Sequence, residues 1–600
     1  DEVNAVARDL MAHVVDFGAP DAARPSAMIA CSPAFLADGT PVNIDSEQLL
    51  AVAAKAATEP IEPEPELIIP AALMEREDVA AMLPEKVVPA TFAEVAGEEE
   101  AKAAAALGVR AQRLANGARI MVKGLPHEAQ RGALRLTMAG GREGEQALKS
   151  ALGSAAVGAR TLQEGGAFDP WSREQVELFC VDRLIMVEVT CSEEKITVDF
   201  GFPTPPPRSG GCSGVEAALQ LVHKILYPGA FLWEPDAFRR AQIGHEQQTE
   251  TSLRSMEGAA QEKLLEDLLG RDERFLSLGK ADADALVLED VEQCMMAQLD
   301  PANVEISVVG DFDAAECERL AVAYVGAVPR PTDVEPLTDR DPSSTNAKLP
   351  ASPGEPRRVH VPDSDPRAVA YVMGAAPNRL GVLADGRTLV ERLLGTSDLS
   401  KAPERWRHPL FAAVALSLVQ EVANRRLFSV VRERKQLTYD ANFRFSEHER
   451  IKGGWYLVSV TASPANAEKA LDACRETLQA LGGSSPPTAD NLEAARRVLV
   501  NRHLAELTSN KYWCEQLTGC GMDAVPQKTL MGLRDYPRLA EQVTVKDLQV
   551  ILKALDTSDD KIHTCIGTSG TGDASEAAAA PPVEEVHSGM INPLMGGRGR

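Results

Sequence analysis

Apolar side chains recur with helical and strand periods through most of the chain, and the order of the resulting segments occurs twice. In the first stretch the pattern predicts strands at 133–138, 183–202 and 304–309, and helices at 145–164, 214–227, 235–269 and 287–298. In the second it predicts strands at 359–361, 368–373, 437–446, 451–463 and 562–566, and helices at 409–434, 465–482, 487–518 and 543–555. The fold class expected is therefore α/β (α+β), built from two repeats over 109–330 and 357–570.

The segments outside these repeats differ in composition. Residues 1–57 begin with a predicted helix over 1–20 that lacks a preceding strand, so we expect them to be the C-terminal remnant of an earlier repeat. Pro, Glu and Ala dominate 58–108, and Pro recurs through 331–356, which predicts two linkers. A short helix is expected over 101–107 within the first of them. The tail at 571–600 is expected to be disordered.

The amino-acid composition limits the classes of binding partner that we expect. The 600 residues include 62 basic and 88 acidic side chains, for a net charge of −26. This charge argues against nucleic acid as the main partner and is compatible with cationic substrates, although it also serves solubility. No run reaches the ~18 uncharged apolar residues of a membrane span. The ten cysteines are scattered without a Cys-x-x-Cys pair, which argues against a zinc ribbon.

The histidines form no complete metallopeptidase motif. His245-Glu246 begins His-Glu-x-x-His, but Thr249 stands where the second histidine is needed. His503 begins His-x-x-Glu-His through Glu506 and is followed by a leucine instead. Because one histidine and one glutamate cannot complete a tetrahedral zinc site, we expect no catalytic and no metal-binding residue in this chain.

The stretch Arg425–Tyr439 is the most informative one. It reads Arg-Arg-Leu-Phe-Ser-Val-Val-Arg-Glu-Arg-Lys-Gln-Leu-Thr-Tyr, a helix end rich in cations followed by the start of a strand. Cations are favoured at a helix C-terminus by the dipole, which is the simpler structural interpretation. The stretch also resembles the signature of the C-terminal half of pitrilysin/insulinase-type zinc metallopeptidases. By that resemblance Arg432 and Tyr439 would contact the substrate backbone.

Further strings support the resemblance. Leu114–Gly117, Gly140–Glu143 and Val304–Asp311 look like landmarks of the family's repeat. In a catalytic repeat the zinc-binding helix would soon follow such a Gly-Gly-Arg, whereas residues 156–162 here contain neither His nor Glu, so 109–330 is expected to be a degenerate, metal-free repeat. Five strings are most similar to a chloroplast branch of the family: 172–180, 272–275, 375–379, 408–411 and 454–456.

The resemblance implies a fold and a function. The fold would be a pair of pitrilysin-like repeats, each a mostly antiparallel sheet with packed helices, that form half of a clamshell. The chain would be the substrate-clamping part of a zinc metalloendopeptidase that removes transit peptides from imported precursors in the chloroplast stroma. Zinc and the His-x-x-Glu-His motif would belong to an N-terminal catalytic half that this chain lacks, so the chain alone would be inactive.

Two other interpretations stay open. The chain could be a non-catalytic, pitrilysin-like scaffold or partner subunit that binds peptides or another chain. It could also belong to a mitochondrial or presequence-degrading peptidase of the same superfamily. A zinc motif encoded shortly upstream in the same reading frame would exclude the scaffold.

Overall fold

The structure is a computed structural model of the chain. It describes residues 2–15, 29–32, 34–36, 40–58, 67–85, 87–88, 90–208, 210–270, 272–330, 337, 347, 353, 355–438, 440–522, 525 and 528–571. The chain divides into two compact units, 1–68 and 69–600. The smaller unit contains helices α1 (Glu2–Val15) and α2 (Ser46–Thr58), and the larger one contains both sheets. No described helix is both long and apolar enough to cross a bilayer.

The first repeat is built on a seven-stranded sheet of order β1-β2-β3-β7-β4-β6-β5. β3 and β7 pair in parallel and the other neighbours are antiparallel. The strands are β1 (Ala90–Thr91), β2 (Val109–Arg113), β3 (Arg119–Gly124), β4 (Arg131–Ala139), β5 (Met186–Cys191), β6 (Lys195–Pro203) and β7 (Val304–Gly310). The helices are α3 (Arg76–Met82), α4 (Phe92–Ala96), α5 (Glu98–Leu107), α6 (Gly141–Leu148), α7 (Ser154–Glu164), α8 (Arg173–Asp182), α9 (Gly214–Leu226), α10 (Pro235–Arg254), α11 (Met256–Leu269), α12 (Lys280–Ala285), α13 (Leu288–Gln298) and α14 (Ala314–Gly326).

The second repeat repeats this topology on a five-stranded sheet of order β10-β11-β9-β12-β8. Its strands are β8 (Arg357–Pro362), β9 (Ala368–Ala376), β10 (Asp440–Phe445), β11 (Gly454–Ala462) and β12 (Ile562–Gly570). Its helices are α15 (Leu389–Leu394), α16 (Phe411–Leu427), α17 (Ala467–Gly482), α18 (Ala489–Glu506), α19 (Asn510–Leu517), α20 (Leu530–Gln542) and α21 (Val545–Ala554). The order matches β5-β6-β4-β7-β3 strand for strand, including one parallel pair, so the expected duplication of a mostly antiparallel α/β unit is confirmed.

Each sheet has one face covered by helices of its own repeat. α7, α9, α13 and α14 pack on the first sheet and α16, α17 and α21 on the second, forming two large apolar cores. Because helices on one face bury alternate strand residues only, the other face of each sheet needs a separate cover.

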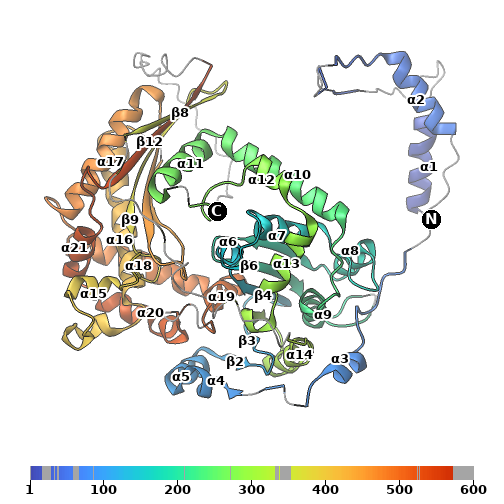
Figure 1. Cartoon of the computed structure of the whole chain (residues 1–600), viewed down its shortest axis with the longest axis horizontal. Helices are drawn as coiled ribbons and strands as arrows, with labels where there is room; N and C mark the ends of the chain where they lie inside the picture. The colour runs from blue at the N-terminus through green and yellow to red at the C-terminus, as the bar shows by residue number, and fades with distance from the viewer. Residues whose placement is uncertain are drawn as a thin grey trace. The chain divides into compact units, whose positions relative to one another are not determined.

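The repeats exchange one helix each to cover those second faces. Met256 and Leu264 of α11, in the first repeat, pack against Tyr371 and Met373 of the second sheet. In return, Trp513 of α19, in the second repeat, packs on the first sheet beside α5. Figure 1 shows α11 in green against the sheet of β8, β9 and β12, and α19 in orange beside β4.

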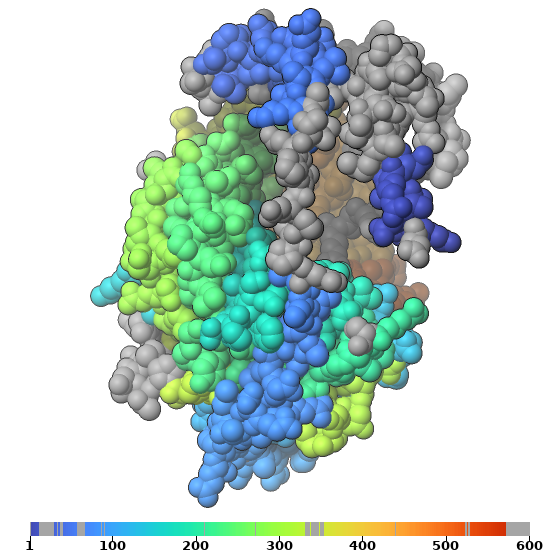
Figure 2. Space-filling view, turned by 90° about the vertical axis from the view of Figure 1, so that its right-hand side faces the viewer, coloured from blue at the N-terminus to red at the C-terminus, as the bar shows by residue number. Residues whose placement is uncertain are grey.

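The stretch expected to be a linker over 58–108 packs on the first repeat from Pro70 onward where the structure describes it. The Trp171 indole N–H donates to the Leu73 carbonyl at 3.0 Å, Arg76 pairs with Glu216 at 2.6 Å, and Ala103 is fully buried. Figure 2 shows this segment in blue over the surface of the first repeat. The composition predicted a solvated linker from the Glu and Pro residues of 59–66, which lie outside the described residues, and a loosely ordered stretch after them to about residue 100. The structure instead uses the alanines as packing residues and Glu100 as a buried acceptor.

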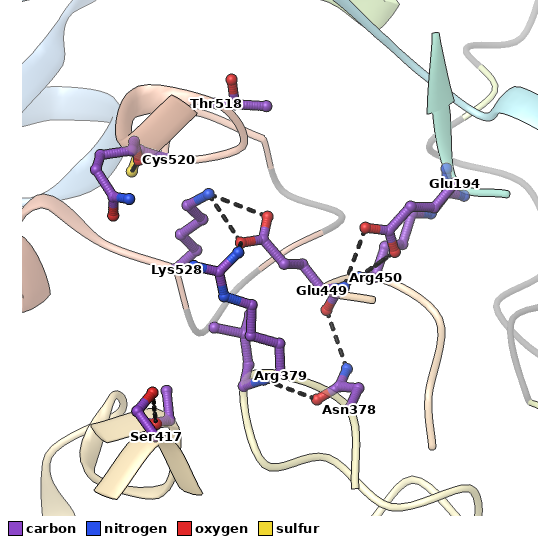
Figure 3. A network of polar contacts seen from close by, with 12 residues as sticks. Glu194, Asn378, Arg379, Ser417, Glu449, Arg450, Thr518, Cys520 and Lys528 are labelled. Atoms are coloured by element: carbon purple, nitrogen blue, oxygen red, sulfur yellow. Dashed lines mark hydrogen bonds and ion pairs between the residues drawn. The ribbon is translucent and has the colours of Figure 1, made fainter. Parts of the chain in front are cut away.

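Carboxylates of the first repeat hold backbone amides of the second repeat. Glu305 accepts the N–H groups of Gly519 and Gly521, both at 2.7 Å, and Glu100 accepts that of Leu530 at 2.9 Å. Glu194 accepts the N–H groups of residues 449–451, which Figure 3 shows from close by. Charge-assisted bonds of this kind are stronger than neutral ones, so they fix the two repeats against each other.

Candidate functional site

Arg432 lies on a widened turn that continues α16. α16 ends at Leu427, and Phe428–Arg434 extend it as a π-helix, a rare form that often marks functional sites. Val431 is fully buried and anchors this turn to the core, whereas Arg432 is exposed. The Arg432 guanidinium carbon lies 4.8 Å from the centroid of the Phe428 ring, a cation–π contact that restricts its orientation.

The residues after the turn are fixed by hydrogen bonds. Gln436 has a φ of 52°, in the left-handed region that a side chain disfavours, and this reverses the chain towards β10. The Leu437 N–H donates to the Val431 carbonyl at 3.1 Å. The buried Thr438 hydroxyl lies 2.6 Å from the Asp440 carbonyl and accepts the Asp440 N–H at 2.9 Å. Tyr439, the second residue of the predicted pair, lies outside the described residues.

Cations gather beside Arg432. A pocket of about 390 Å³ is lined by Arg425, Arg426 and Arg434 together with Val422, Ser429, Val430, Ser485, Thr488 and Asn491. Arg425 pairs with Glu421 at 2.9 Å, and Arg426 donates to the Ser485 hydroxyl at 2.8 Å. In a chain of net charge −26 this is a local positive surface, suited to peptide carbonyls or carboxylates.

The two incomplete zinc motifs lie on different helices, α10 and α18. His245 is partly buried, which together with Arg142 and Arg160 lowers its pKa, and its neighbour Glu246 pairs with Lys280. His503 is buried, with its Nδ1 2.7 Å from the Tyr512 hydroxyl. Across the ranges that the structure describes, no three His, Cys, Asp or Glu side chains are placed to hold a metal ion, so those residues do not fit zinc.

The sequence analysis missed the contacts that orient Arg432. Phe428 stands four residues before it on the same helix, a spacing at which side chains meet, and this signal could have been used. The roles of Gln436 and Thr438 depend on how the turn meets β11, and no pattern in the sequence indicates that.

Part of the chain matches the model of a known class of peptidase domain. Residues 285–499 match the family model described as the Peptidase M16 inactive domain. This part of the chain is therefore similar to a domain of the M16 peptidases, and the matched domain is the one described as inactive.

Curated relatives match the chain along its whole length. It is 35% identical to the chloroplastic stromal processing peptidase of Pisum sativum over 100% of this chain, and 33% identical to that of Arabidopsis thaliana over 98%. The chain spans about half of these relatives, 48% of each. Their names confirm the resemblance predicted from the sequence and the predicted location in the chloroplast stroma.

Solved structures confirm the fold. The peptidase M16 inactive domain from Pseudomonas fluorescens has a TM-score of 0.59 at 18% identity and covers 78% of this chain and 99% of its own. The ferredoxin protease FusC, solved as a mutant with Arabidopsis ferredoxin, has a TM-score of 0.57 at 15% identity over 88% of this chain and 51% of that one.

Proposed function

We propose that the chain is the substrate-clamping part of a zinc metalloendopeptidase that removes transit peptides from imported chloroplast precursors. The observation that carries the proposal is the presentation of Arg432 on the π-helical turn, in a chain related along its whole length to stromal processing peptidases. An exposed guanidinium can donate to peptide carbonyls, and a phenol at position 439 could do the same. Together they would hold the scissile peptide in register.

In this proposal the zinc ion belongs to a separate catalytic half of the protein. When bound there, zinc supplies a polarised water and a Lewis acid for peptide hydrolysis. The residues of this chain would instead bind and orient the peptide. Transit peptides are rich in Arg and Ser and poor in acidic residues. The acidic chain would therefore attract them, and their association should slow as salt is added.

The test uses the protein with its catalytic half restored. Arg432→Ala should lower kcat/KM for precursor cleavage about ten- to a hundredfold, the effect of removing one charged hydrogen bond. Zinc content and melting temperature should stay unchanged, since the Arg432 side chain is exposed. Arg497→Ala, which removes an exposed arginine paired with Glu493 on α18, is the matched control and should cleave normally.

A normal kcat/KM for Arg432→Ala would rule out a substrate contact by this residue. A large fall in melting temperature with normal cleavage would show that Arg432 is a structural cap. If the restored protein contains no zinc and cleaves nothing, the scaffold interpretation takes the place of the proposal.

A further inference from the structure

β5 ends the seven-stranded sheet in the part of the chain that the structure describes. Beyond its end, the Ser192 N–H donates to the Lys195 carbonyl, so even-numbered residues direct their backbone groups towards β6. Because successive residues of a strand point these groups in opposite directions, Val187, Val189 and Cys191 direct theirs away from the sheet. Such an edge is a template for one more strand.

A side chain already occupies part of this edge. The Val189 N–H donates to Oε1 of Gln163 at 2.7 Å, and Nε2 of Gln163 donates to the Val187 carbonyl at 3.4 Å. The primary amide of Gln163, on the last turn of α7, therefore stands where a peptide group of an added strand would stand. One of its two bonds is long and correspondingly weak.

The equivalent edge of the second repeat is closed more firmly. On β10, the Phe443 N–H donates to Oδ1 of Asn424 at 2.6 Å, and Nδ2 of Asn424 donates to the Phe443 carbonyl at 3.0 Å. Phe443 itself is only 1% exposed. A side-chain amide thus occupies both edges, with two short hydrogen bonds on β10 and only one on β5.

Besides its exposed backbone edge, β5 faces an open trough. Its volume is about 680 Å³, and β5, α7 and α10 form its walls. Ala156 and Ala159 on α7 leave room because their side chains are small. Arg160 and His245 are among the residues that line the trough.

We infer that β5 is a second peptide-binding site, where an extended polypeptide segment adds as a strand in place of the Gln163 amide. The trough is walled by helices on the side of α7 and α10, so it fits one strand and not the edge of another folded sheet. The backbone would give most of the affinity, which makes the site tolerant of sequence. Polar side chains of the segment could meet Arg160 and His245.

The inference rests on the proposed function for one point only, that the ligand is a polypeptide. It adds a docking site in the first repeat, whereas Arg432 lies in the second. A peptide could therefore bind at one of these sites and not at the other, and the two claims can fail separately.

Hydrogen–deuterium exchange with a short synthetic peptide rich in Ser and Arg tests the site. Bound to the 600-residue chain, the peptide should slow exchange in 186–191 and leave β10, over 440–445, unchanged. Two N-methylated versions of the peptide, each modified at one of the two sets of alternate residues, give the control. Only one edge of the added strand bonds β5, so one version should lose this protection and the other should keep it. Protection confined to 428–440 would overturn the inference while supporting a contact at Arg432.

A substitution of Gln163, whose amide occupies the edge of β5, gives an independent result. Gln163→Met keeps the length of the side chain and removes its amide, so the peptide no longer competes with it, and the Kd should fall about five- to tenfold. Gln479→Met makes the same change on α17, where Gln479 donates to the Thr557 carbonyl, and should leave the Kd unchanged. An unchanged or higher Kd for Gln163→Met would overturn the proposed exchange at the edge.

Discussion

Both carboxylate oxygens of Glu194, in the first repeat, lie 3.0 Å from the backbone nitrogen of Glu449, in the second. The same carboxylate accepts the N–H groups of Arg450 at 2.8 Å and Ile451 at 3.2 Å (Figure 3). Glu449 in turn pairs with Lys528 at 2.9 Å. Burial alone would raise the pKa of Glu449, but Lys528 and other nearby cations lower it below its usual value.

Removing the Glu194 carboxylate should weaken the junction between the repeats. Glu194→Ala leaves two buried N–H groups and one partly buried N–H group without their acceptor, which we expect to cost about 3 kcal/mol of stability. The measurement is the midpoint of urea unfolding. Glu193→Ala changes the preceding, more exposed glutamate and should shift the midpoint little. Equal shifts for the two variants would show that Glu194 is not a specific link.

The exchanged helix α11 should stabilise the second repeat although it belongs to the first in sequence. Leu264 is fully buried against the second sheet, so Leu264→Ala should cost about 2–5 kcal/mol. Amide exchange should speed up in β9 and β12. Leu253→Ala, at a half-exposed leucine of α10, is the control and should leave these strands protected. Faster exchange limited to α10 and α7 would contradict the role given to α11.

Fragments should behave according to the helix exchange and not according to the repeat boundary. A fragment starting at residue 356 leaves the Tyr371 face of the second sheet uncovered, and we expect it to aggregate. A peptide of residues 255–270, which spans α11, should bind this fragment when added to it, make it more soluble and give it a cooperative melting transition. Size-exclusion chromatography and calorimetry compare the fragment with and without the peptide. A monomeric, cooperatively folded 356–571 fragment would show that α11 is dispensable.

His503 should make stability depend on pH. Burial lowers its pKa below the ordinary value of about 6.5. As pH falls below that value, the unfolded chain takes up a proton that the folded chain refuses, so this contribution to stability is lost on acidification. His503→Gln can still bond Tyr512 and does not titrate. Urea unfolding between pH 5 and pH 7.5 should show a smaller loss of stability for this variant, and an identical slope would rule out a buried neutral His503.

Periodicity predicted most elements but not where helices break. The expected helix over 145–164 is two helices, α6 and α7, with residues 149–153 between them. The expected helix over 235–269 ends and restarts at Ser255, whose hydroxyl accepts the Gly258 N–H at 3.0 Å. The expected helix over 487–518 breaks before Ser509, which caps α19 in the same way. Serine also occurs inside helices, so the local sequence does not identify these two serines as helix caps. The breaks at these serines exist because α11 and α19 each leave their own repeat to cover the other sheet.

The candidate site was only partly predictable. Arg432 was found by its spacing and resemblance, and its place on an exposed turn next to buried Val431 agrees with that prediction without testing its role. Gln163 could not be found, because its function depends on β5 being the last strand of the sheet. That order follows from long-range pairing, which no local pattern encodes.

The reciprocal exchange of α11 and α19 also bears on how such a chain can change over generations. A repeat with no zinc-binding motif has no metal ligands to retain, which alone would allow it to accumulate substitutions or to be deleted. Deleting the first repeat would remove α11, which covers the second sheet, and would leave α19 without the first sheet that it covers. We therefore expect the two repeats to be retained or lost together.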